Sequence, residues 1–383
     1  MSIHFTKEEF KERQSRVIKE LKNQGLDALL MFRQDSMYWL TGYDTFGFVF
    51  FQCLVLTTKG DLILLTRAPD LRQAQNTSII NDIRIWVDKD KSNPSDELKN
   101  ILAELGLEKS NLGIEYEAYG LTGRNAIKLN NSLRNFATIK DKSELVSHFR
   151  VVKSVAEIAY VKKAASLADN AMELAWKYAH AGVSESKILA EMQGSIFNEG
   201  GDYPANEFII GSGKNALLCR YQSEKKILSK IDQLSIEWAG AYKHYHSAMF
   251  RTILIGKIND KQNKMYDACF ETLKACENKL KPGSSAGEVF DAHAKTFDKL
   301  GYKNARMNAC GYSLGALFAP NWMDWPMLYT GNPYVIKPGN VFFMHMILMD
   351  SDNNLAMNLG ETYLVTEAGN ERLGKKKLDL VLG

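Results

Sequence analysis

LSIEWAGAYKHYHSAMFRTILIG, at residues 234–256, is the segment from which the rest of the chain is best interpreted. Glu237 stands in an otherwise apolar, strand-like run that leads into a glycine-containing turn, and the chain returns through 244–246 to Arg251. A carboxylate inside an apolar strand is costly unless it is paired or takes part in chemistry. Two interpretations of Glu237 therefore stay open, a functional carboxylate or a buried ion pair with Arg251.

The segments around this hairpin predict an α+β domain over residues 151–383. A long helix pattern follows Ser154, a suitable N-cap whose capping-box partner is Glu157. Further helix patterns cover 185–198, 260–280 and 286–300, and strand-like runs cover 207–211, 233–239, 249–255, 341–349 and 361–366. This order of elements indicates helices laid on an antiparallel sheet.

Residues 1–150 show a different alternation of elements. A helix pattern at 10–23 leads into a strand-like run at 28–32, and a hairpin is expected at 49–66. Helix, strand and helix candidates follow at 96–105, 112–115 and 123–131. We expect a mixed α/β first domain, because 383 residues exceed what one hydrophobic core usually supports.

Composition and charge exclude several classes of protein. Apolar residues make up 45% of the chain and charged residues 24%, as in ordinary globular proteins. The net charge of +3 comes from interspersed residues of both signs, so no nucleic-acid partner is expected. No apolar run reaches the roughly 18 residues that span a membrane, and no secretory signal is visible. The five scattered cysteines favour a reducing cytoplasm over a disulfide framework.

The hairpin resembles a motif of the pita-bread superfamily, which includes creatinase, prolidase and methionine aminopeptidase. There a strand aspartate, a glycine, a Gly-Tyr pair and a second aspartate before an Arg-Thr pair hold two metal ions. The matching residues are Glu237, Gly240, Tyr245, Ala248, Arg251 and Thr252, and further matches lie at 150–157, 311–315, 338–346 and 361–369. The resemblance implies a creatinase-like N-terminal domain at 1–150, a pita-bread catalytic domain at 151–383, and a homodimer.

Most of the superfamily's metal ligands are missing from this chain. The five ligands are Asp, Asp, His, Glu and Glu, and their positions here hold Glu237, Ala248, Tyr312, His345 and Gly360. Alanine and glycine offer no ligand atoms, and tyrosine is a poor ligand for the usual divalent ions. Glu361 could slide into the last position, but a bridged two-metal site needs more carboxylates than these. We therefore expect neither a metal nor another cofactor.

The metal-free ectoine hydrolases resemble the chain more closely than creatinase does. Creatinase has a second carboxylate in its hairpin where Phe250 stands here. The ectoine hydrolase pattern includes LTGYD, QC, GGDYPA and a Glu-x-Ala-Gly strand, found here in the same order at 40–44, 52–53, 200–205 and 237–240. One departure is Arg220, at a position where the superfamily usually has a histidine. Since arginine is well suited to a carboxylate, an acid related to ectoine is also a possible substrate.

Three residues are expected to carry the chemistry. Glu237 attacks an electrophilic carbon or activates water, because without a metal some carboxylate must do this work. His345 acts as acid or base, since its ordinary pKa of about 6.5 suits proton transfer. Tyr312 donates a hydrogen bond to the developing oxyanion. For His345 and Tyr312, the alternative is an ordinary core residue whose polar atoms are hydrogen-bonded within the protein.

The expected substrate-binding residues come from both domains. Arg220 is interpreted as a carboxylate clamp, with a surface salt bridge as the alternative. Tyr43 belongs to an aromatic loop that in this superfamily can reach the site of a neighbouring subunit, and core packing is its alternative. The remaining residues are His246, Tyr245, Glu361 and Trp322. For His246 and Tyr245, orienting the hairpin is an alternative role.

The sequence thus predicts a cytoplasmic, metal-independent hydrolase that cleaves a C–N bond of a small, carboxylated nitrogen compound. Ectoine ring opening to an N-acetyl-diaminobutyrate is the most specific hypothesis. The expected partner is this small-molecule substrate, without nucleic acid or membrane. The alternatives are an Xaa-Pro peptidase-like metalloenzyme, an osmolyte lyase of the dimethylsulfoniopropionate type, and a non-catalytic binding module.

Overall fold

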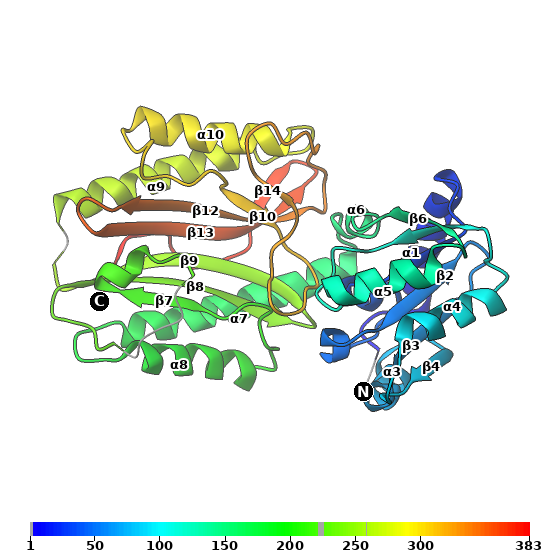
Figure 1. Cartoon of the computed structure of the whole chain (residues 1–383). Coiled ribbons are helices and arrows are strands. Elements are labelled where there is room, and N and C mark those ends of the chain that lie inside the picture. Colours follow the sequence, from blue (N-terminus) through cyan, green and yellow to red (C-terminus); the bar gives the residue numbers. More distant parts are fainter. Residues whose placement is uncertain (1–2, 221–225, 258) are drawn as a thin grey trace. The chain divides into compact units, whose positions relative to one another are not determined.

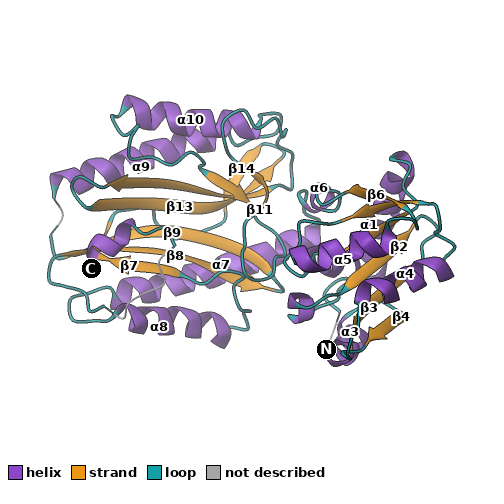
Figure 2. Cartoon of the chain, viewed as in Figure 1, coloured by secondary structure: helices purple, strands orange, loops and turns teal. Residues whose placement is uncertain are grey.

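The computed structural model describes residues 3–220, 226–257 and 259–383 of the chain (Figure 1). The chain divides between Arg150 and Val151 into two compact units. Each unit contains one sheet, of six strands in the first and nine in the second (Figure 2). No helix in the described residues combines the length and the apolarity that a membrane crossing requires.

The first unit is a mixed sheet with strand order β4-β3-β2-β1-β5-β6. Its elements are α1 Lys7–Asn23, β1 Ala28–Met31, α2 Gln34–Thr41, β2 Cys53–Thr57, β3 Leu62–Arg67, α3 Leu71–Thr77, β4 Asp82–Trp86, α4 Pro94–Glu104, β5 Asn111–Ile114, α5 Gly123–Leu133, β6 Thr138–Asp141 and α6 Ser147–Arg150. Alternate residues of β1 join two core clusters, one with α4 and α5 and the other with α1, α2 and α3. Helices therefore cover both faces of this sheet.

The second unit is built on seven antiparallel strands in the order β11-β10-β12-β13-β9-β8-β7, with β14 beside β13 and β15 beside β9. Its elements are α7 Val155–Tyr178, α8 Glu185–Asn198, β7 Ile209–Ser212, β8 Asp232–Tyr242, β9 Tyr245–Ile255, α9 Asp260–Lys279, α10 Ala286–Lys299, β10 Gly311–Ser313, β11 Asp324–Met327, β12 Val341–Asp350, β13 Leu355–Thr366, β14 Gly369–Arg372 and β15 Val381–Leu382. The predicted helices on an antiparallel sheet are confirmed.

Four helices cover one face of this second sheet, which we call the outer face. Helix α7 packs on β8 and β9, helix α9 packs on β12 and β13, and α8 and α10 pack against these two helices (Figure 1). The predicted capping box of Ser154 and Glu157 begins α7. The opposite face, called the inner face below, carries the side chains expected to be catalytic.

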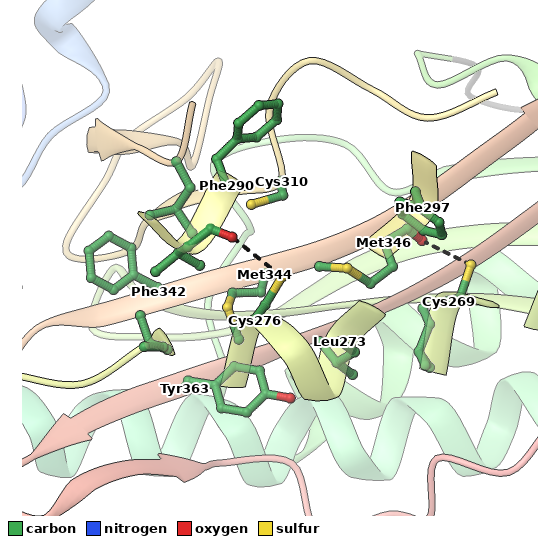
Figure 3. Close-up of a cluster of buried hydrophobic side chains, with 14 of the residues drawn as sticks. Cys269, Leu273, Cys276, Phe290, Phe297, Cys310, Phe342, Met344, Met346 and Tyr363 are labelled. Atoms are coloured by element: carbon green, nitrogen blue, oxygen red, sulfur yellow. Dashed lines mark hydrogen bonds between the residues drawn. The ribbon is translucent and has the colours of Figure 1, made fainter. Parts of the chain in front are cut away.

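The outer-face core behind β12 is rich in sulfur (Figure 3). The Cys269 thiol donates to the backbone oxygen of Met346 at 3.8 Å, and the Cys276 thiol donates to that of Val289 at 3.7 Å. Burial raises the pKa of Cys269 and of Cys310. All five cysteines are free thiols, and these buried ones pack as small apolar residues.

The hairpin of β8 and β9 differs from the sequence expectation at its glycine. The turn consists of Lys243 and His244, whose φ angles are 49° and 64°, and Gly240 lies inside β8. A Cβ atom at Gly240 would stand 2.0 Å from the backbone oxygen of Ala164 on α7. Glycine is therefore required by the close approach of helix to strand, and not by the turn.

We expect Gly240→Ala to lower the free energy of unfolding by about 1–3 kcal/mol, because the added methyl group overpacks this contact. Urea denaturation followed by circular dichroism measures the change. Gly194→Ala in α8 is the matched control, since a Cβ there meets nothing within 4 Å, and it should be neutral or stabilising. Equal stability of the two variants would contradict the packing argument.

Candidate active site

One row of paired residues places two of the expected catalytic side chains on the inner face. His345 of β12 pairs with Gly360 of β13, which in turn pairs with Phe250 of β9. Phe250 pairs with Glu237 of β8. Residues opposite one another in neighbouring strands point to the same face. Glu237 and His345 therefore face the same side of the sheet.

Tyr312 shows that the sheet curls around this face. It lies on β10, and three strands, β12, β13 and β9, stand between β10 and β8 in the sheet. In a flat sheet, four strand spacings amount to about 19 Å. The Tyr312 hydroxyl nevertheless donates to Glu237 Oε1 at 3.3 Å. Curling of the sheet therefore brings β10 back toward β8.

Trp322 fixes the direction of that hydrogen bond. Its indole N–H donates to the Tyr312 hydroxyl at 2.9 Å. Since indole can only donate, the hydrogen of Tyr312 remains available for Glu237. Burial, followed by the charge of Glu237, raises the pKa of Tyr312 well above its ordinary value, which keeps it a donor. Trp322, expected to bind substrate, thus reaches the site through Tyr312.

Glu237 is buried but can still exchange a proton near neutral pH. Burial raises its pKa to about 7, while the hydrogen bond from Tyr312 and the positive charge of Arg220 act in the opposite direction. The arginine of the same hairpin, Arg251, does not pair with it. The ion pair with Arg251 is therefore not formed, and the acidity of Glu237 is of the kind that suits acid–base or nucleophilic chemistry.

His345 lies next to Tyr312, with 5.7 Å between the ring centroids. Burial lowers its pKa to about 4, so the imidazole is neutral at neutral pH. Its backbone N–H donates to the backbone oxygen of Cys310 at 2.9 Å. Within the described parts of the chain, nothing hydrogen-bonds to its buried Nδ1. This ring nitrogen therefore retains its capacity to form a hydrogen bond.

Arg220 also belongs to this group, although it is exposed. Its positive charge contributes to lowering the pKa values of Glu237, Tyr312 and His345. The structure therefore brings together the three expected catalytic residues, and the charge of the expected carboxylate clamp acts on all three.

Two other expected binding residues hold the hairpin in place. The Tyr245 hydroxyl donates to Glu157 Oε1 at 2.7 Å, which ties β9 to the start of α7. His246 Nε2 accepts the backbone N–H of Ala205 at 2.9 Å, and burial lowers the pKa of this histidine to about 4. Both side chains are fully buried. Their placement fits the orienting role.

The structure does not bring Glu361 to the inner face. Glu361 follows Gly360 on β13 and so points to the outer face. There it forms a buried ion pair with Arg251, whose Nη1 also donates to the backbone oxygen of Gly360 at 2.7 Å. The expected substrate contact of Glu361 is therefore corrected to a structural ion pair.

Tyr43 lies in the core of the first unit. Its side chain is fully buried, and its hydroxyl donates to Gln52 Oε1 at 3.0 Å. Burial raises the pKa of Tyr43. In the same loop Phe46 is 82% exposed. Core packing, the alternative given for Tyr43, describes its placement in this unit.

The two metal ions of the superfamily do not fit this inner face. Among the described residues, no group of three or more His, Cys, Asp or Glu side chains is placed to hold a metal. A Cβ at Gly360 would stand 2.8 Å from ring carbons of Phe343 and 2.9 Å from Cβ of Phe250. Aromatic side chains thus occupy the space that a carboxylate at 360 would need.

The curled antiparallel sheet, its outer helices and the preceding mixed α/β unit define a two-domain pita-bread protein. Residues 159–367 match the model of metallopeptidase family M24, and residues 13–152 match the creatinase/prolidase N-terminal domain. The chain belongs to metallopeptidase family M24, a family of hydrolases. The predicted resemblance and fold class are confirmed.

Known relatives cover the whole chain but differ in activity. An ectoine hydrolase from Halomonas elongata is 27% identical over 97% of each chain. An Xaa-Pro dipeptidase from Pyrococcus furiosus is 23% identical over 97% of this chain and 100% of its own. The solved Xaa-Pro dipeptidase from Bacillus anthracis superposes with a TM-score of 0.85 at 22% identity, over 98% of this chain and 100% of its own.

Breaking the outer-face ion pair should destabilise the protein without touching the inner face. Arg251→Met alone should cost about 3–5 kcal/mol, because the buried charge of Glu361 then keeps only its longer contact with Arg372, at 3.6 Å. The double variant Arg251→Met/Glu361→Leu should recover most of this loss. Chemical denaturation of both variants measures the difference. A double variant whose losses simply add would show that the two charges do not interact.

Proposed function

We propose that the protein is a metal-independent hydrolase that opens a cyclic C–N bond in a small, carboxylated nitrogen compound, and that ectoine is the first substrate to test. The observation that carries this proposal is Glu237, a buried carboxylate with a pKa of about 7 that accepts a hydrogen bond from Tyr312, on a face whose described residues do not form a metal-binding group. A group of this acidity can act as base or nucleophile at neutral pH.

The roles of the side chains follow from their protonation states. Ionised Glu237 attacks the electrophilic ring carbon or removes a proton from the attacking water. Neutral His345 can accept a proton from the attacking water, and the proton taken from water passes to the departing nitrogen. Tyr312, a donor held by Trp322, stabilises negative charge as it develops. Addition of one water across the ring C–N bond of ectoine yields an N-acetyl-diaminobutyrate, so the reaction balances without a cofactor.

Arg220 supports a carboxylated substrate. An arginine that is exposed, and whose charge still reaches Glu237 and His345, can bind a carboxylate at the edge of the site through two hydrogen bonds. The 27% identity to an ectoine hydrolase agrees with this choice. The Xaa-Pro dipeptidase relatives favour peptide hydrolysis instead, but the donor set here offers two metal ions too few ligands.

Chelator treatment combined with one substitution tests this proposal. Ectoine turnover should be unchanged after dialysis against a strong chelator, with less than one metal ion per chain by mass spectrometry. Glu237→Gln should lower kcat by about a thousandfold or more, since the charged oxygen is lost, while ectoine binding measured by calorimetry is retained. The matched control is Glu367→Gln, a carboxylate just beyond β13, which should leave turnover unchanged.

Each of the other outcomes of this test would establish one of the alternative functions. Stoichiometric metal and chelator-sensitive cleavage of Xaa-Pro dipeptides would establish the peptidase alternative. Acrylate release from dimethylsulfoniopropionate would establish the lyase. Ectoine binding without turnover by the wild-type protein would leave a binding module.

The pH dependence of kcat/KM should follow Glu237. The carboxyl must be ionised to act, so kcat/KM should fall about tenfold per pH unit below about pH 7. Tyr312→Phe removes a hydrogen bond that lowers this pKa, so the acid limb should move to higher pH. An acid limb near pH 4.5 that does not move in Tyr312→Phe would contradict the assignment of Glu237.

A further inference from the structure

A second polar row lies beside the row of Glu237 on the inner face. Ser235, Thr252 and Asn358 stand two residues from Glu237, Phe250 and Gly360 on the same strands. Side chains two residues apart in a strand share a face, about 7 Å apart along it. These three polar residues are therefore neighbours of the proposed catalytic groups.

The amide of Asn358 is bound by two hydroxyl groups. Its Nδ2 donates to Ser235 Oγ at 2.8 Å and to Thr252 Oγ1 at 3.1 Å, which uses both amide hydrogens. Thr252 Oγ1 also accepts the backbone N–H of Asn358 at 2.9 Å. The oxygen of the amide is thereby directed away from its two partners. Asn358 is 2% exposed.

This oxygen lacks a partner in the described part of the chain. Asn358 Oδ1 is buried and accepts no hydrogen bond from any described group. A buried acceptor without a donor costs free energy, so such atoms need an explanation. Nδ1 of His345 is likewise buried and has no hydrogen bond to any described group. His345 pairs with Gly360, two residues from Asn358, so the two atoms belong to diagonal neighbours on one face.

These atoms make the inner face rich in acceptors. Glu237, the neutral ring of His345 and Asn358 Oδ1 can all accept hydrogen bonds. A planar group with several N–H bonds would satisfy these three acceptors, which a peptide carbonyl cannot do. A positive charge on that group would also be favoured by ionised Glu237.

We propose that Asn358 is a substrate-binding residue whose Oδ1 accepts an N–H of the substrate, and that the substrate class is a small amidinium carboxylate. The inference rests on the proposed function and names the end of the substrate opposite to the carboxylate bound by Arg220. Ser235 and Thr252 are positioning residues, because they act only by holding the amide.

Calorimetric titration of ectoine, and of ectoine derivatives methylated at either ring nitrogen, tests this assignment. The titrations use Glu237→Gln protein to prevent turnover. Adding Asn358→Leu should weaken ectoine binding by about 10- to 100-fold, as expected for a hydrogen bond from a charged donor. It should hardly affect the derivative in which a methyl group replaces the recognised hydrogen. Adding Ser235→Ala instead keeps the acceptor and should change the affinity less than about threefold.

Steady-state kinetics with active protein complete the test. Asn358→Leu should raise KM for ectoine and leave kcat within a few-fold, with a melting temperature no lower than that of Ser235→Ala. Equal ectoine affinity with and without Asn358→Leu would overturn the assignment, as would equal weakening by Ser235→Ala. Turnover by Glu237→Gln would refute the proposed function but not the role of Asn358. Failure of the wild-type protein to bind any of these ligands would overturn both.

Discussion

A shift of one residue in the pairing of β8 with β9 would carry Glu237 from the inner face to the face covered by α7. Contacts from both strands of the hairpin to helix α7 set the register that prevents this shift. Gly240 allows α7 to approach β8 closely, and Tyr245 bonds to Glu157 at the start of α7. The position of the candidate nucleophile is thus decided by a helix that contributes no group to the chemistry.

The two faces of the sheet hold their buried carboxylates in different ways. On the outer face, Arg251 and Glu361 neutralise one another, and the arginine also binds two backbone oxygens. On the inner face, the hydrogen-bond partner of Glu237 is a phenol, and burial raises its pKa although the charge of Arg220 acts in the opposite direction. Two carboxylates of one sheet, on strands that β9 separates, thereby acquire different surroundings from the direction in which each points.

The sequence was informative where the signal was local. The capping box of Ser154 predicted the start of α7, and a charge in an apolar run identified Glu237. Three-residue strands such as β10 are too short to show a period. The partner of Arg251 could not be inferred, because it depends on the pairing of β9 with a strand more than 100 residues away. Asn358 gave no signal, since a single asparagine in a strand is ordinary.

The packing around Gly360 bears on how this protein relates to its metal-binding family. Phe343 and Phe250 are buried against the glycine, so a glutamate placed there alone would collide with a core that cannot yield. Ligands would also have to return at Ala248 and Tyr312 before any ion could bind. A ligand introduced at position 360 alone would therefore carry a steric cost without completing a metal site.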